Sequence, residues 1–165
     1  MKIKCNNLIL KTFSKKNLNK KYFSWFKNQK ILKFSRHNKN NYDYKYFLNY
    51  YLTQKKNKNI FLAIYKKKKV FIGTITANFD TKKKSADLGI LIGDLRYRKK
   101  GFGLEAWKNL IEILFKKYNL KFITGGANIN NKSMINILIK SKMKLFEENK
   151  IKKFIKYIIY NENKI

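Results

Sequence analysis

The chain has 165 residues, and its 40 Lys and Arg against 9 Asp and Glu give a formal net charge of +31. This length suits one compact domain, residues 1–165, with a sizeable core. A single cysteine and a single histidine exclude an intrachain disulfide and a Cys/His zinc site, and no signal peptide or long apolar run is found, so we expect a cytoplasmic protein with no metal and no membrane partner.

The positive charge allows two interpretations. A strongly basic chain is typical of proteins that bind nucleic acid or anionic membranes. Here the lysines are spread along the whole chain beside many Asn, Ile, Phe and Tyr residues, and Pro is absent, as the codons of an AT-rich genome would produce. We therefore favour compositional bias over selection for an anionic partner.

The first half of the chain predicts one strand, two helices and then three antiparallel strands. Apolar residues recur at helical spacing from Leu18 to Phe26, and Asp43 is placed to open a second helix. Runs rich in β-branched and aromatic residues indicate the strands. The expected strands cover residues 8–13, 59–65, 70–79 and 85–93.

The second half predicts alternating helices and strands. A helix over 102–118 is followed by a strand over 121–127, and a second helix then starts at Asn131. Two further strands are expected at 144–146 and 154–160. The strand before the first of these helices and the strand after it form a β-α-β unit, whose crossover makes the two strands parallel.

The turn that opens this unit's helix reads RKKGFG, residues 98–103. A glycine turn entering a helix gathers free backbone N–H groups at the positive end of the helix dipole, which makes an anion site. Gly101 permits a positive φ, Gly103 leaves room for a phosphate, and the three preceding cations add charge. On the turn alone, a plain helix start is an equal alternative.

The context of the turn is more specific. It is neither GxxxxGKS nor GxGxxG, so P-loop and dinucleotide-binding folds lose support. It reads RxxGxG, follows the strand DLGILIG and precedes, one helix and one strand later, the helix start NNKSM. This combination resembles the GNAT superfamily of acetyl-CoA-dependent N-acetyltransferases, closest to the branch of ribosomal-protein alanine acetyltransferases and amino-sugar acetyltransferases.

The resemblance implies a fold and a co-substrate. The fold is an α/β (α+β) single domain with a mixed central sheet of about six to seven strands, helices on both faces and splayed parallel strands at the CoA site. Acetyl-CoA would lay its pantetheine arm along the splayed strand and its pyrophosphate on the turn amides, with Lys99, Lys100 or Lys132 at the 3′-phosphate. The cofactor-binding residues implied are Ile90, Leu91, Ile92, Arg98, Lys99, Lys100, Gly101, Phe102, Gly103 and Asn131.

Three positions qualify these assignments. Asn131 would contact the pantetheine arm, or it is only the N-cap of its helix. Lys142 and Met143 stand where the family has a Gly-Phe pair. Leu138 stands where many members carry a tyrosine that protonates the leaving thiolate. We therefore exclude a tyrosine general acid at this position, and the thiolate leaves unassisted or takes a proton from water.

The implied reaction is attack of an amine on the thioester carbonyl. It needs a base for the amine proton and a backbone donor for the oxyanion, such as the Ile92 amide. Asp87 is our candidate base, with pairing inside the sheet as the alternative, whereas Glu105 at the helix start favours a structural role. Arg36 and His37, in the loop after the first helix, are candidate contacts to the acceptor.

Two classes of function remain. The first is acetyl transfer to a primary amine, either on a small molecule such as an aminosugar nucleotide or on a protein N-terminus. The second is a basic nucleic-acid-binding protein without catalysis, which would gather aromatic residues on one sheet face. The aromatics instead follow helix and strand periodicities, so we do not expect a nucleic-acid partner, while a homodimer stays open. The positive field slightly favours an anionic amine as acceptor.

Overall fold

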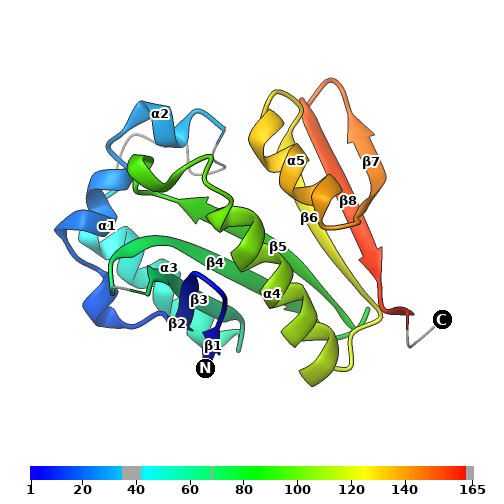
Figure 1. Ribbon diagram of the computed structural model, residues 1–165, viewed down its shortest axis with the longest axis horizontal. Helices are drawn as coiled ribbons and strands as arrows, with labels where there is room; N and C mark the ends of the chain where they lie inside the picture. Colours follow the sequence, from blue (N-terminus) through cyan, green and yellow to red (C-terminus); the bar gives the residue numbers. More distant parts are fainter. Residues whose placement is uncertain (35–41, 68, 163–165) are drawn as a thin grey trace.

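The structure is a computed structural model that describes residues 1–34, 42–67 and 69–162. Its centre is a mixed sheet with the strand order β1-β2-β3-β4-β5-β6-β8-β7 (Figure 1). The strands are β1 (Lys2–Lys4), β2 (Leu8–Thr12), β3 (Ile60–Lys66), β4 (Phe71–Asp80), β5 (Ser85–Ile92), β6 (Phe122–Asn128), β7 (Lys144–Asn149) and β8 (Phe154–Tyr160). The helices are α1 (Lys20–Trp25), α2 (Gln29–Leu32), α3 (Tyr44–Lys56), α4 (Phe102–Lys117) and α5 (Lys132–Lys140), with 3₁₀ turns at Lys15–Asn17 and Leu95–Tyr97.

The predicted β-α-β unit is confirmed. β5 and β6 pair in parallel and are joined through α4, while the other neighbouring strands of the described sheet pair antiparallel. The sheet has eight strands in its order, one more than the upper limit expected. The additional strand is β1, which pairs with β2 through Ile3 and Leu10. Three residues with one buried side chain give no periodicity that the sequence could reveal.

Side-chain caps explain where the helices begin. The Asp43 carboxylate accepts a hydrogen bond from the Tyr46 amide at 2.7 Å, which confirms its predicted place at the start of α3. The helix expected over residues 18–26 is shorter, because Asn19 caps the start of α1, and a separate α2, capped by Asn28, follows it. Both caps use a side-chain oxygen on a free backbone amide, a local contact that competes with a continuous helix.

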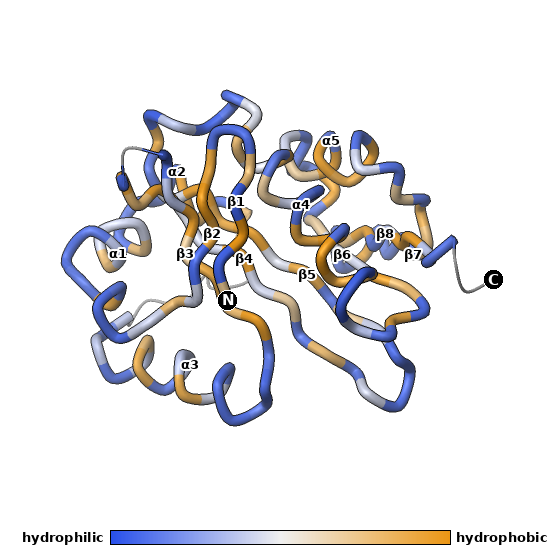
Figure 2. Tube along the Cα trace, turned by 60° about the horizontal axis from the view of Figure 1, so that its bottom comes forward, coloured by the Kyte–Doolittle hydropathy of each residue, from blue (hydrophilic) through white to orange (hydrophobic). Residues whose placement is uncertain are grey.

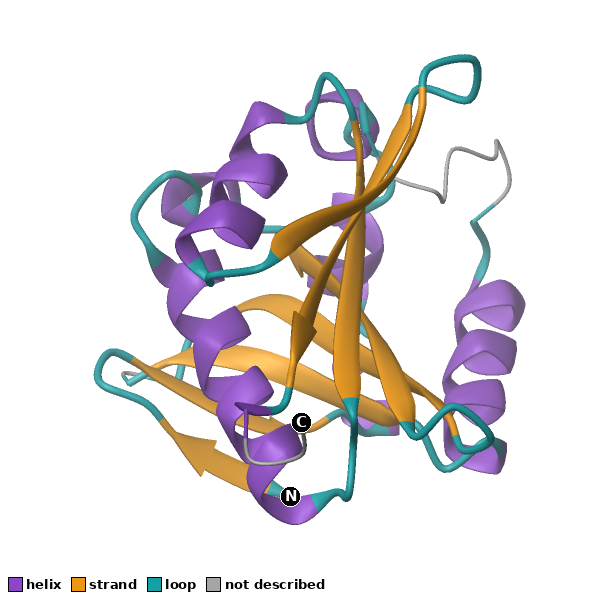
Figure 3. Cartoon of the chain, turned by 90° about the vertical axis from the view of Figure 1, so that its right-hand side faces the viewer, coloured by secondary structure: helices purple, strands orange, loops and turns teal. Residues whose placement is uncertain are grey.

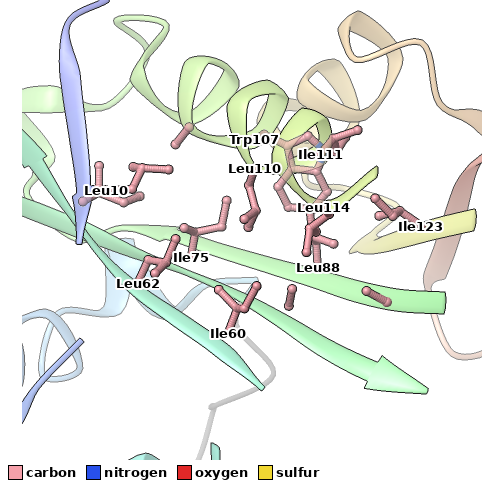
Figure 4. Close-up of a cluster of buried hydrophobic side chains, with 14 of the residues drawn as sticks. Leu10, Ile60, Leu62, Ile75, Leu88, Trp107, Leu110, Ile111, Leu114 and Ile123 are labelled. Carbon is pink, nitrogen blue, oxygen red and sulfur yellow. The ribbon is translucent and has the colours of Figure 1, made fainter. Parts of the chain in front are cut away.

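Helices cover both faces of the sheet, as expected (Figure 3). On one face, α4 and α5 pack on the strands through a core that includes Trp107, Leu110 and Leu114, all fully buried (Figure 4). On the other face, α1, α2 and α3 pack through an aromatic cluster in which the Phe13 and Phe61 rings stack at 4.1 Å. The Phe13 and Phe61 side chains are buried and form part of the core of this face.

The chain's hydropathy follows this layering. Hydrophobic segments run along the central strands and the inner sides of α4 and α5, and hydrophilic segments form the outer turns (Figure 2). In the described ranges, none of the helices combines the length and the apolar character that a membrane span requires.

Candidate active site

The turn between β5 and α4 has the backbone geometry of an anion site. Lys99 and Gly101 both take a left-handed conformation, with φ of 59° and 81°, and α4 begins directly after Gly101. Among the described residues, the amides of residues 99–104 donate no hydrogen bond. These amides therefore form a nest of donors at the positive end of the α4 dipole. The positive φ of Gly101 was expected, whereas that of Lys99 was not.

The donors of Arg98 point in other directions than expected, since we expected its amide and its charge to face a phosphate. Its Nε donates to the Ile92 carbonyl at 2.7 Å and its Nη1 to the Lys30 carbonyl at 3.2 Å. Its amide donates to the Leu95 carbonyl at 3.2 Å, and burial lowers the pKa of its guanidinium. Arg98 therefore holds the turn against β5 and α2, because its side chain donates to one carbonyl of each.

Strands β5 and β6 diverge beside this turn. Their parallel pairing ends at Leu88 and Gly125, although β5 continues to Ile92 and β6 to Asn128. Backbone groups of alternate strand residues point to opposite sides. The Ile92 carbonyl faces Arg98, on the side of β5 that points away from β4. The backbone groups of Ile90 face that side as well. The wedge between the strands therefore offers backbone donors and acceptors.

Leu91 does not share this direction. An ideal Cβ built on Gly73 of β4 would lie 2.2 Å from the Leu91 carbonyl oxygen, which shows that this carbonyl points toward β4. The side chain of Leu91 packs on the α1–α3 face of the sheet. Its backbone is thus directed away from the wedge, although Leu91 lines the cleft, and its contact with the pantetheine arm stays a prediction.

The start of α5 forms the opposite side of the wedge. The Asn131 side chain accepts a hydrogen bond from the Met134 amide at 3.2 Å and also lines the cleft, so the cap that the sequence left as an alternative is present. Leu138 is fully buried and its Cδ2 lies 3.0 Å from an ideal Cβ on Gly125, so it faces the core rather than the cleft. Lys142 takes a φ of 60° and thereby keeps the left-handed turn at the Gly position of the family pattern.

Asp87 is held in the cleft by two neighbouring strands. Its Oδ1 accepts a hydrogen bond from the Thr124 hydroxyl of β6 at 2.7 Å, and Lys156 Nζ of β8 lies 3.9 Å from the same oxygen. Its side chain is 32% exposed. All nine carboxylates belong to described residues, and Asp87 is the one that lines the cleft. This location comes from strand register, because Asp87 lies opposite Thr124.

The other candidate carboxylates have structural partners. Glu105 accepts hydrogen bonds from the Asn7 amide at 2.6 Å and from Asn7 Nδ2 at 3.2 Å, which ties the β1–β2 turn to the first turn of α4. Asp80 accepts a hydrogen bond from the Lys83 amide within its turn. Asp94 accepts hydrogen bonds from Arg96 and pairs with Lys21. Each of them stabilises a local turn.

The cleft itself has a volume of about 960 Å³ and passes between the turn, the wedge and the α1–α3 face of the sheet. Tyrosines that the sequence analysis did not single out, Tyr22, Tyr50 and Tyr97, lie along it. Seven cationic residues line it against the single carboxylate: Lys30, Lys33, Arg98, Lys99, Lys140, Lys152 and Lys153. The candidate acceptor residues Arg36 and His37 lie outside the described residues.

A protein-family model described as an acetyltransferase (GNAT) domain matches residues 7–144. The chain belongs to the GNAT acetyltransferase family. It is an acetyltransferase, and acetyl-CoA is its co-substrate. The predicted family is thus confirmed, as is the α/β fold with one mixed sheet.

Solved structures are similar to this GNAT domain over nearly its whole length. RimL, a ribosomal L7/L12 alpha-N-protein acetyltransferase in complex with coenzyme A, has a TM-score of 0.85 and 11% identity, covering 97% of this chain and 98% of its own. Ribosomal-protein-S5-alanine acetyltransferase from Vibrio fischeri has a TM-score of 0.78 and 14% identity, covering 100% and 99%. The microcin C7 self-immunity acetyltransferase MccE, in complex with acetyl-CoA and AMP, has a TM-score of 0.78 and 15% identity, covering 94% and 93%. No curated protein sequence matches the chain.

The residues of this GNAT domain fit acetyl-CoA. The nest of free amides suits a pyrophosphate, and the wedge suits an extended polar arm that replaces the missing strand partner. An ideal Cβ on Gly103 would lie 3.1 Å from Ile137 Cδ1 and 3.7 Å from Ile92 Cγ1, so this glycine lets the start of α4 lie close to α5 and β5. Thr124 and Lys156, which position Asp87, could not be found from the sequence, because they are distant along the chain and carry no motif.

The Asp94 ion pairs predict an acid-dependent loss of stability. The Arg96 hydrogen bond and Lys21 hold the pKa of Asp94 at about 2, below its ordinary value of 3.8. Because the folded pKa is depressed, this contribution is present above about pH 4 and disappears as the pH falls toward 2. We expect Asp94→Asn to lower the free energy of unfolding by about 1–2 kcal/mol at pH 7, a range that allows for solvent screening because Arg96 is exposed. Below pH 4 this loss of stability should become progressively smaller. Urea unfolding at pH 7, 4 and 3 measures this.

The control is Asp80→Asn, which changes an exposed turn carboxylate 3.9 Å from Lys83 and should alter stability little at any of these pH values. A destabilisation by Asp94→Asn that is the same at pH 3 as at pH 7 would contradict the assigned charge pairing.

Proposed function

We propose that residues 1–165 form a single N-acetyltransferase domain that moves the acetyl group of acetyl-CoA to a primary amine. The observation that carries this proposal is the meeting of the amide nest with the β5–β6 wedge in one cleft that also holds Asp87. In this proposal the amides of residues 99–104 bind the pyrophosphate. Lys99, Lys100 and Lys132 attract the 3′-phosphate, and Arg98 keeps the turn in place from within.

The wedge has a separate role from the turn. Backbone groups of Ile90 and Ile92 bond the pantetheine arm, and the Ile92 amide is the donor for the developing oxyanion. Asn131 caps α5 with its Oδ1 and contacts the arm from the opposite side. Asp87 takes the proton of the attacking amine, directly or through water. Its Thr124 and Lys156 partners support this role, because they hold the carboxylate in a fixed place within the cleft.

The acceptor is an amine that also carries negative charge, such as an aminosugar nucleotide. The seven cations and single carboxylate along the cleft support this class, because they attract anions and repel cationic peptide tails. A protein N-terminus is the second candidate, favoured by the similarity to RimL and to the S5 alanine acetyltransferase, whose names give ribosomal proteins as their substrates. The MccE complex with AMP favours the nucleotide.

Gly103→Val tests the CoA site. The branched side chain would occupy the space between α5 and β5, while the flexible end of Ile137 can shift and preserve the fold. We expect CoA affinity, measured by calorimetry, to fall about tenfold or more with little change in the unfolding midpoint. Lys117→Gln, at the far end of α4, is the control and should bind CoA like the parent chain. Unchanged CoA binding by Gly103→Val would show that the site is elsewhere.

Asp87→Asn tests the base. We expect turnover to fall by about 10² to 10⁴ and the acidic limb of the pH–rate profile to disappear, because the amide cannot take the amine proton. CoA binding should be retained. If the variant keeps the parent's pH profile, Asp87 is not the base.

Removal of positive charge from the cleft tests the acceptor class. Lys152→Gln with Lys153→Gln removes two cations from the cleft, and Lys55→Gln with Lys56→Gln removes two exposed cations from the end of α3 as the matched control. We expect the cleft pair to raise KM for a phosphate-bearing amine several-fold at low salt, with less effect at high salt, and the control pair to change it little. Thiol release at two salt concentrations measures this. Faster acetylation of a neutral or basic peptide than of any phosphate-bearing amine would favour the protein N-terminus instead.

A further inference from the structure

A row of polar side chains crosses the α1–α3 face of the sheet just before the wedge opens. Asn78 of β4 lies opposite Asp87 of β5, and Asp87 lies opposite Thr124 of β6. Residues directly opposite on neighbouring strands point to the same face, with Cβ atoms about 4.5–5.5 Å apart in an antiparallel pair. Asn78 and Asp87 both line the cleft. The row therefore presents an amide and a carboxylate side by side to whatever enters the cleft.

The orientation of the Asn78 amide is set by a chain of hydrogen bonds. The Phe79 amide donates to Asn59 Oδ1 at 3.0 Å, and because a backbone N–H requires an acceptor, the oxygen of Asn59 must face it. The Nδ2 of Asn59 is then free to donate to Asn78 Oδ1, also at 3.0 Å. With its oxygen engaged on that side, Asn78 directs its Nδ2 the other way, and within the described residues this Nδ2 has no hydrogen-bond partner.

Neighbouring groups leave this donor available. The hydroxyl of Thr76, two residues earlier on β4, donates to the Gly89 carbonyl at 3.4 Å. Asp87 is drawn to the far side of the row by Thr124 and Lys156, which both contact its Oδ1. The cleft thus holds, on adjacent strands, the Asp87 carboxylate, which can take a proton, and the Asn78 Nδ2, which can only donate hydrogen bonds.

We propose that Asn78 is a specificity-determining residue that selects amines with an oxygen on the neighbouring carbon, namely 2-amino alcohols and α-amino carbonyl compounds. This inference rests on the proposed function, with Asp87 facing the amine. An oxygen on the carbon next to the amine-bearing carbon reaches the Asn78 Nδ2 while the nitrogen faces Asp87. Plain alkylamines leave the donor unpaired, which a site built for a hydrogen bond discriminates against.

The experiment compares acceptors of equal shape. The pairs are 2-aminoethanol with propylamine, and alaninamide with 3-methylbutan-2-amine, each measured as kcat/KM for thiol release from acetyl-CoA. We expect the parent chain to prefer the oxygen-bearing member of each pair. In Asn78→Leu and Asn78→Asp this preference should fall about tenfold, since neither variant offers a donor. Taking the ratio within a pair, and comparing it between variants, cancels the different basicities of the amines.

A variant of Asn59 tests the orientation of the Asn78 amide without changing Asn78 itself. Asn59→Asp keeps the oxygen that accepts from the Phe79 amide but replaces the donor toward Asn78 by an oxygen. Asn78 should then turn its Nδ2 toward the new carboxylate and its Oδ1 to the cleft, and the preference should again be lost. Asp80→Asn, next on the same face of β4, is the matched control and should keep the parent's preference.

The outcomes separate the two proposals. A parent chain without the preference, or Asn78 variants that retain it, would overturn the role of Asn78. If the preference is lost in Asn78→Leu and Asn78→Asp but kept in Asn59→Asp, Asn59 does not set the orientation of the Asn78 amide. A parent chain that binds CoA and acetylates neither these four amines nor a phosphate-bearing amine would count against the proposed function itself, whereas one that acetylates only the phosphate-bearing amine would overturn the role of Asn78.

Discussion

The early end of the β5–β6 pairing is the constraint on which the rest of the site depends. Two parallel strands separate after Leu88 and Gly125 while both remain extended, which leaves backbone donors and acceptors without a strand partner. Such groups are costly when buried and unpaired. The molecule satisfies part of them internally, because Arg98 donates to the Ile92 carbonyl. The remaining groups of the wedge face the cleft.

This arrangement also decides what the glycine turn can do. Arg98 directs its guanidinium to the Ile92 and Lys30 carbonyls, so the turn is held by a half-buried cation rather than by the ligand it would bind. The amides of residues 99–104 are then oriented before any anion arrives, since Lys99 and Gly101 already hold left-handed conformations. A preformed nest binds an anion without first ordering the loop, which lowers the entropic cost of binding.

The two faces of the sheet have different roles. The α4–α5 face is an aliphatic core with Trp107 at its centre, which supports the turn and the wedge from below. The α1–α3 face is aromatic at one end and polar at the other, where Asn78, Asp87 and Thr124 cross adjacent strands. Buried polar groups need hydrogen-bond partners, and here Thr124 donates to Asp87 while Asn59 donates to Asn78. The lysines around the cleft add a positive field whatever the origin of the chain's net charge.

The sequence by itself determined most of the order of the elements, the parallel crossover, the helix cap at Asp43 and the glycine turn at 98–103 that leads into α4. These features depend on local periodicity, side-chain contacts within three residues and the conformational freedom of glycine, all of which can be read along the chain. It also narrowed the base to a short set of carboxylates, because the chain has only nine. Only the tertiary structure decided that Arg98 turns inward, that the Leu91 backbone faces β4, and that Asp87 meets Thr124, Lys156 and Asn78. Those contacts are set by strand register and by the divergence of β5 from β6, which bring together residues that are far apart in the sequence and share no motif.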